Sequence, residues 1–266
     1  APQVKLLPPK MWMAEVRDET TMFTKRKIYY GWVVTLASAF ITFGVSGSQF
    51  SFGVFLKPMS EEFGWSRATL ATAFGITFVL SGLLRPVGGY MADRYSAKAV
   101  ALAGVALMAG MLLLVSQIEN LIQLYFVFAV MSIGLTLAAG PTLTKVVSAW
   151  FYSRRGVTLG LVNGGGSMGG LILVPAASLF LVLASWREAY LFLGLFLLFL
   201  VLPIGVLLIK NRPQDIGLQP QGKSGNDESF DGTIVRYAGE NEANDATFRE
   251  AIRTPFFWKL TAGYFV

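Results

Sequence analysis

The stretch WFYSRRGVTLGLVNGGGSMGG, residues 150–170, combines two adjacent arginines with seven glycines in a run of helical length. In a water-soluble helix each glycine costs about 1 kcal/mol relative to alanine, so this concentration of glycine needs a physical reason. A loop that cradles a phosphate group is one such reason. A membrane helix that another helix must approach closely is a second. The rest of the chain decides between them.

The composition of the chain favours a membrane protein. Of its 266 residues 54% are hydrophobic and only 14% are charged, whereas soluble domains carry about 25% charged residues. Windows without any charged residue cover 28–56, 68–84, 99–118, 120–144, 156–186 and 189–209. A bilayer core needs roughly 20 apolar residues in helical form. Five windows are that long, and the helix of the sixth, 68–84, must continue through Arg85 towards Asp93. We therefore predict an all-α membrane protein with six spanning helices.

The glycine-rich stretch then has a structural explanation. Gly156, Gly160 and Gly164 repeat at every fourth residue, and Gly165 pairs with Gly169 in the same way. Such small-residue repeats let two membrane helices pack closely. A phosphate-binding loop would need a GK[ST] ending or a preceding strand, and the stretch has neither. The five glycines are therefore predicted to be helix-packing residues.

The distribution of basic residues predicts the orientation and the domains. Sixteen lysines and arginines lie before the first predicted span, in the connections between the second and third spans and between the fourth and fifth, and in the segment 210–255. The other connections hold only three. By the positive-inside rule both termini are expected in the cytoplasm, in a multi-pass protein of the cell membrane. The expected parts are a cytoplasmic segment 1–29, a six-helix bundle 30–209, a cytoplasmic loop 210–255 and the start of a seventh span at 256–266. The first residue, Ala1, and the short last apolar run suggest a fragment without its C-terminal half.

Several classes of function are disfavoured by what the sequence contains. It has neither cysteine nor histidine, which excludes disulfides and thiolate or imidazole metal sites. No nucleophile–base pair is recognisable, so we do not expect an enzyme, and we expect no cofactor. The topology explains the net charge of +6, so a nucleic-acid partner is not needed. The expected surroundings are the lipid bilayer. A non-transporting membrane sensor stays open as an alternative.

Polar side chains form stripes on the first and fourth predicted helices. The stripes are Thr35, Ser38, Thr42, Ser46 and Gln49, and Tyr125, Ala129, Ser132, Thr136, Gly140 and Thr144. The spacing puts each set on one helix face. Such faces form hydrogen bonds between helices or line a shared aqueous path, and we favour the path. The predicted substrate-cavity residues are Gln49, Tyr125, Asn163, Ser46, Thr136 and Arg85.

Three charged residues near the membrane need separate interpretation. Lys145 follows a window already long enough to span, so its ammonium is expected to reach the interface. Arg85 lies within a span, where a charge is expensive, and it fits an anion-attracting role or a gate or interface role equally well. Asp93 ends the second span on the cytoplasmic side, where its carboxylate can pair with Arg94, Arg154 or Arg155 and so hold two helix bundles together.

Several motifs resemble one known family of membrane transporters. GGYMADRYSAK resembles the loop between helices two and three of the major facilitator family, with matches at Gly89, Asp93, Arg94 and Lys98. It departs at Ser96, where glycine is usual, and lacks a second basic residue after Lys98. YYGWVV, SFGVFLKPMSEEFGWSRA and the glycine-rich stretch look like the monocarboxylate transporter branch and its oxalate–formate exchanger relatives. NRPQDIGLQPQG and REAIRTPFFWKL resemble the loop that leads into the second half.

This resemblance implies a twelve-helix transporter with two six-helix halves that rock about a site at mid-membrane. It implies a small organic anion as substrate, a monocarboxylate or dicarboxylate, carried with a proton or exchanged for another anion. Gly89, Asp93, Arg94, Lys98, Arg154 and Arg155 are the expected gating residues. The residues that grip the carboxylate are generally on helix eight, and no acid lies deep in the six spans, so any proton-coupling acid is expected beyond Val266. A facilitator for a sugar or drug is the alternative.

Overall fold

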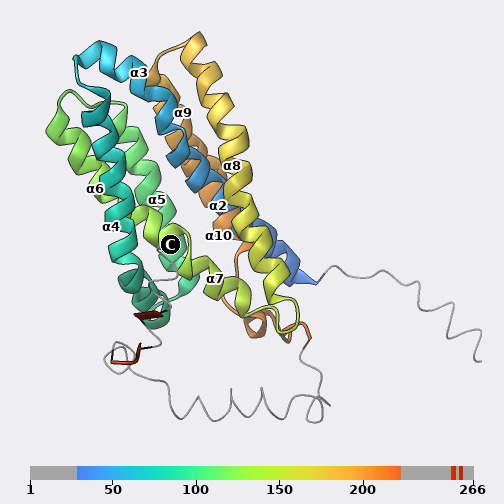
Figure 1. The fold of residues 1–266 in the computed structure, drawn as a ribbon. Coiled ribbons are helices and arrows are strands. Elements are labelled where there is room, and N and C mark those ends of the chain that lie inside the picture. The colour runs from blue at the N-terminus through green and yellow to red at the C-terminus, as the bar shows by residue number, and fades with distance from the viewer. Residues whose placement is uncertain (1–28, 223–252, 256–257, 260–266) are drawn as a thin grey trace, which may run out of the picture. The chain divides into compact units, whose positions relative to one another are not determined.

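The computed structural model describes residues 29–222, 253–255 and 258–259, in two separate units that divide after Gly222. The first unit is the helical bundle drawn in Figure 1. Its elements are α2 (Tyr30–Phe50), α3 (Phe52–Phe63), α4 (Arg67–Arg94), α5 (Ala97–Val115), α6 (Leu121–Ala138), α7 (Pro141–Ser148), α8 (Arg155–Leu183), α9 (Trp186–Phe196), a π-helix at Leu197–Val201, α10 (Leu202–Leu208) and a 3-10 turn at Pro213–Ile216. Most of loop 210–255 and of the predicted seventh span, 256–266, lies outside the described residues.

The described helices make six membrane-length spans, as predicted. Three of them consist of consecutive elements: α2 with α3, α6 with α7, and α9 with the π-helix and α10. The second span runs from Arg67 to Arg94, so it includes Arg85 and extends past Asp93. The prediction of an all-α bundle with six spans is confirmed.

The connections between spans lie alternately at the two ends of the bundle (Figure 1). We call one end the basic end; it holds the connections 95–96, 149–154 and 209–222. The opposite end holds the connections 64–66, 116–120 and 184–185. Polar residues cap four helices and fix where they begin, because their side chains accept a backbone N–H that has no partner within the helix. These caps are Ser66, Ser96, Asn120 and Ser185.

Three spans are interrupted, each for a local reason. The first breaks at Ser51, between α2 and α3. The fourth breaks at Gly140, whose φ of 62° and ψ of −124° strongly favour glycine, and Pro141 then starts α7. In the sixth, the π-helix immediately precedes Pro203, which has no N–H to donate to a carbonyl one turn back. Hydrophobic length alone predicts none of these breaks.

The closest helix pair is α2 with α8. A Cβ added to Gly165 would lie within 3.0 Å of the backbone of Ala39, and one added to Gly169 would meet the backbone of Phe43 equally closely. Gly47 of α2 meets the backbone of Gly169 in turn. The two backbones are therefore in direct contact, and only glycine fits between them. By contrast, a Cβ at Gly156, Gly160 or Gly164 would meet no described atom within 4 Å.

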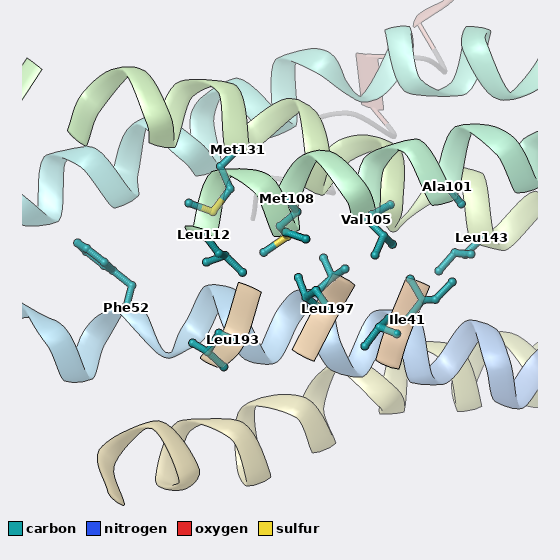
Figure 2. Close-up of a cluster of buried hydrophobic side chains, with 14 of the residues drawn as sticks. Ile41, Phe52, Ala101, Val105, Met108, Leu112, Met131, Leu143, Leu193 and Leu197 are labelled. Atoms are coloured by element: carbon teal, nitrogen blue, oxygen red, sulfur yellow. The ribbon is translucent and has the colours of Figure 1, made fainter. Parts of the chain in front are cut away.

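The centre of the bundle is a continuous apolar core. Figure 2 shows Ile41 of α2, Val105 and Met108 of α5, and Leu193 and Leu197 of the sixth span pointing towards one another. All five side chains have no exposed surface. Such complete burial stabilises the packing of the first, third and sixth spans.

Two spans leave most of their surface open. We compared the most apolar 18-residue window of each span. Only 22% of this window is buried in α4 and 22% in α8, against 61% in the first span. Large apolar side chains such as Val79, Leu83, Leu171 and Val182 are exposed along them. These faces suit lipid or further helices, because water disfavours so much apolar surface.

Candidate functional site

The basic end contains a pocket of about 300 Å³. It lies where the end of α4, the start of α5, α7 and the segment after α10 come together. Its charged and polar lining is formed by Asp93, Ser96, Lys145, Asn211, Arg212 and Asp215. Two acidic and two basic side chains thus share one cavity, so the formal charges of its lining cancel.

Asp93 pairs with Lys145 across this pocket. The Lys145 Nζ lies 2.5 Å from Asp93 Oδ1 and also donates to the carbonyl of Ala92 at 2.8 Å. The expected partners, Arg94, Arg154 and Arg155, make no ion pair with Asp93 among the described residues. The reason is that α7 packs beside α4, which brings Lys145 to the end of that helix. The ammonium of Lys145 therefore joins the second and fourth spans.

The other predicted gating residues lie around the same end. Lys98 ties the start of α5 to the sixth span, since its Nζ donates to the carbonyl of Val206 at 2.6 Å and its backbone N–H to Asn211 Oδ1 at 2.9 Å. Arg155 donates from Nε to the carbonyl of Phe151 and lies over the ring of Tyr152. Arg94 and Arg154 are exposed, and Gly89 is half-buried with open space around its Cα.

A set of aromatic side chains, which we call the aromatic clamp, holds the segment that follows the sixth span. The clamp consists of Tyr29, Tyr30, Trp150 and Phe151, whose rings lie within 5.6–6.1 Å of one another in three pairs. The Tyr29 hydroxyl donates its one proton to the carbonyl of Gln219 at 2.7 Å and shares it with the carbonyl of Trp150 at 3.1 Å.

The clamp also holds the segment through backbone and indole hydrogen bonds. Trp150 Nε1 donates to the carbonyl of Lys210, and the Tyr30 hydroxyl to that of Leu208. Gln221 forms a short parallel bridge with the connection before α8, donating its N–H to Trp150 and accepting one from Tyr152. The motifs YYGWVV and WFYSRR thus meet in space, where the chain leaves the sixth span.

Replacing Tyr29 with phenylalanine tests the clamp. Burial raises the pKa of the Tyr29 phenol above its ordinary value, so the hydroxyl stays a donor at physiological pH. Losing this shared hydrogen bond should cost roughly 0.5–1.5 kcal/mol, about 1–6 °C in melting temperature. Trypsin should also cleave faster after Lys210. Tyr95→Phe, an exposed tyrosine at the same end, is the control, and equal behaviour of the two variants would contradict the clamp.

The predicted cavity residues lie in different environments and do not form one site. Gln49 and Thr136 are buried, at 7% and 6% exposure. The Thr136 hydroxyl donates to the carbonyl of Ser132 at 2.8 Å and shares its proton with that of Ser81 at 3.3 Å. Tyr125 is half-buried and its hydroxyl donates to the carbonyl of Thr69. Ser46 lies beside Gly166 at the α2–α8 contact, whereas Asn163 is exposed on α8.

The polar stripe of the first helix lies mainly inside the bundle. Thr35, Ser38 and Thr42 are buried, and the two threonine hydroxyls donate to carbonyls one turn earlier in α2. Most of this stripe therefore does not line an open aqueous path within the described bundle. The stripe of the fourth span becomes exposed only from Gly140 onwards.

Arg85 lies on the open side of the bundle, near the interruption of the fourth span. It is exposed on α4, one turn beyond Ser81, whose carbonyl accepts the Thr136 hydroxyl at 3.3 Å. Gly140, Pro141 and Thr144 are exposed on the neighbouring span. A cationic side chain and the N-terminus of α7 are therefore both exposed, on two spans that pack against each other.

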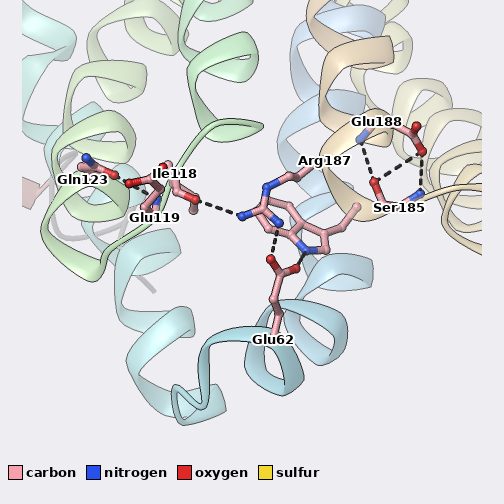
Figure 3. Close-up of polar contacts among 8 residues, drawn as sticks. Glu62, Ile118, Glu119, Gln123, Ser185, Arg187 and Glu188 are labelled. Atoms are coloured by element: carbon pink, nitrogen blue, oxygen red, sulfur yellow. Dashed lines mark hydrogen bonds and ion pairs between the residues drawn. The ribbon is translucent and has the colours of Figure 1, made fainter.

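At the opposite end, one ion pair joins the ends of two helices and one connection (Figure 3). Glu62, at the end of α3, accepts hydrogen bonds from Trp186 Nε1 and Arg187, and Arg187 also donates to the carbonyl of Ile118. The guanidinium lies 4.4 Å from the centre of the Trp186 ring. We call these residues the Glu62 cluster. It ties the first, third and sixth spans together.

Comparison with known proteins decides the family. The Major Facilitator Superfamily model matches residues 38–266. The chain belongs to this superfamily. Its members are membrane transporters and not enzymes. The chain spans about half the length of the curated relatives that it matches.

Two major facilitator relatives carry names that describe a substrate class. The oxalate:formate antiporter of Oxalobacter formigenes is 22% identical over 88% of this chain and 51% of its own length. Monocarboxylate transporter 11 of Mus musculus is 32% identical over 67% of this chain and 40% of its own length.

A solved structure of another major facilitator protein shares the fold. A bacterial homolog of the human lysosomal transporter Spinster, in an inward-facing and unoccupied conformation, matches 90% of this chain and 52% of its own chain, with a TM-score of 0.62 and 19% identity. This likeness concerns the fold alone.

Proposed function

We propose that the whole protein is a secondary transporter of small organic anions that works by alternating access. The observation that carries the proposal is the exposure of Arg85 on α4, the helix that packs against the interrupted fourth span. The acidic residues of the spans, Glu61, Glu62, Asp93, Glu119 and Glu188, all lie at helix ends or in connections. Arg85 thus places a cation within the second span, in the third of it nearer the basic end, while the acids lie at the ends of the spans, and this distribution favours an anion.

The interruption at Gly140 supports the same conclusion. Discontinuous helices are a common feature of transporter sites, because the N-terminal end of a helix segment attracts anionic groups. Here α7 starts at Pro141 and its first turn is partly exposed. The names of two relatives, an oxalate:formate antiporter and a monocarboxylate transporter, agree with a carboxylate substrate.

The open faces of α4 and α8 are the proposed contact surface for a second six-helix half. Gly156, Gly160 and Gly164 form a small-residue row on α8 with free space above it. Such a row allows close approach and sliding between helices. In this arrangement the pocket of Asp93 and Lys145 lies at the predicted cytoplasmic end, where it acts as the gate.

Uptake by the full-length protein in proteoliposomes tests the substrate class. We expect accumulation of labelled lactate, pyruvate or oxalate, driven by an inward proton gradient or by a carboxylate loaded inside. The two driving forces distinguish symport from exchange. Uptake of glucose without uptake of any carboxylate would overturn the proposal.

Substitution of Arg85 tests directly whether this side chain attracts the carboxylate. A charge-assisted hydrogen bond contributes about 1.5–3 kcal/mol, so Arg85→Gln should raise the KM for the carboxylate roughly 10- to 100-fold. Arg85→Lys keeps the charge and should recover part of this loss. Arg67→Gln, an exposed arginine at the opposite end, is the control. An unchanged KM in Arg85→Gln would show that this side chain does not attract the substrate.

A further inference from the structure

A small cavity lies inside the bundle, next to the interruption of the first span. It is enclosed by side chains of α2, α3, α4, α5, α6 and α9, among them Ser48, Gln49, Phe52, Met131 and Tyr190. The volume in which the centre of a water molecule fits is about 10 Å³. A single water molecule needs roughly 10–15 Å³ by this measure, so the cavity has room for one water and for no organic solute.

Three residues that line this cavity each carry a polar atom without a hydrogen-bond partner among the described residues. These atoms are Ser48 Oγ and Gln49 Nε2 at the end of α2, and the Tyr190 hydroxyl on α9. Their residues are 1%, 7% and 1% exposed. Burying a polar group without a partner is unfavourable, and nearly all such groups in folded proteins are satisfied. Thr77, which also lines the cavity, already donates to the carbonyl of Phe128 at 3.1 Å.

We propose that one structural water molecule occupies this cavity and bridges Ser48, Gln49 and Tyr190. Water supplies two donors and two acceptors, so it can accept from the amide of Gln49 and from one hydroxyl while it donates to the other. If the Gln49 amide is flipped, so that its oxygen faces the cavity, the same water donates to that oxygen. No charged side chain lines the cavity, which disfavours an ion.

The position of this water gives it a structural role. Ser48 and Gln49 are in the last turn of α2, immediately before the break at Ser51, and Tyr190 belongs to the sixth span. The bridge therefore fixes the end of α2 against the sixth span where the first span loses its regular helical hydrogen bonds. It also assigns Gln49 to the interior of the half and not to a substrate contact.

The sign of one stability change tests the proposal. If water is bound, Tyr190→Phe removes one of its partners, and the melting temperature of the full-length protein should fall by roughly 2–4 °C. If the cavity is dry, the same substitution removes an unpaired buried hydroxyl, and the melting temperature should rise or stay unchanged. A rise or no change would overturn the proposal.

A double-mutant cycle tests whether the water is shared. Ser48→Ala and Tyr190→Phe should be non-additive, since both act on the same water. Ser38 is the matched control, because its hydroxyl is equally buried and unpartnered but does not line the cavity. Ser38→Ala combined with Tyr190→Phe should be additive. Additivity in both cycles would contradict a shared water.

Radiolytic labelling in ¹⁸O-water detects the molecule directly. Met131 lines the cavity, whereas Met108 is fully buried away from its lining. During a short X-ray pulse Met131 should incorporate ¹⁸O several-fold faster than Met108. The double variant Gln49→Leu, Tyr190→Phe leaves Ser48 as the only one of the three partners, and labelling of Met131 should then fall to the level of Met108. Equal rates in the unmodified protein would overturn the proposal.

Discussion

Gly169→Val is expected to prevent the first and fifth spans from packing. A Cβ at this position would lie within 3.0 Å of the backbone of Phe43, and a backbone cannot move aside as a flexible side chain can. Overpacking a core usually costs about 1–3 kcal/mol, and we expect a larger cost here because the two helices must separate. The measurement is the yield of monodisperse protein and its melting temperature in detergent.

The same substitution at Gly110 is the control. Gly110 is in the middle of α5, and a Cβ there would meet no described atom within 4 Å. Gly110→Val should therefore give normal yield. Gly164→Val adds information, because it should leave the six-helix unit folded yet disturb transport if a second half packs on α8. Normal yield and melting temperature for Gly169→Val would show that the α2–α8 contact is looser than described.

Asp93→Asn should slow transport strongly and leave substrate binding nearly intact. The pair with Lys145 is partly exposed, at 73% and 43% for the two side chains, so it contributes little to folding stability. Its proposed role is to bias one of two conformations. A bias of about 1.4 kcal/mol changes such an equilibrium tenfold, and we expect a loss in turnover of about that size. Initial uptake rates and equilibrium substrate binding measure the two effects separately.

Exchanging the two charges makes this test specific. Asp93→Lys combined with Lys145→Asp restores an ion pair between the same spans and should recover part of the turnover. Lys57→Gln removes a different exposed ion pair, with Glu61 at 3.8 Å, and should have no effect. If Asp93→Asn weakened substrate binding and left the turnover at saturating substrate unchanged, the gating role would be contradicted.

The six spans could be predicted because they depend on one property, the absence of charge over a length set by the bilayer. The absence of charge can be read from each segment alone, without knowing which other segments it contacts. The breaks at Ser51 and Gly140 are different, since both lie inside windows without a charged residue. Gly140 followed by Pro141 was a usable signal, because this dipeptide commonly marks a turn. Ser51 carried no comparable signal.

The partners of individual side chains could not be predicted. Lys145 is 52 residues from Asp93 in the sequence, and only the packing of α7 beside α4 brings them together. The glycines show the same limit. Overlapping repeats of equal quality occur on α8, and the crossing with α2 selects Gly165 and Gly169. Periodicity finds a helix face, but it does not say which neighbour the face meets.

The Glu62 cluster also determines what an antibody can recognise at the opposite end. Glu62 of α3, Ile118 of the connection 116–120 and Arg187 of α9 are far apart in sequence and meet only in the folded bundle. A binder directed at this surface would have a discontinuous epitope that denaturation destroys. Such a reagent would report correct assembly of the first, third and sixth spans on intact cells, and its access from outside or inside would reveal the sidedness of the membrane protein.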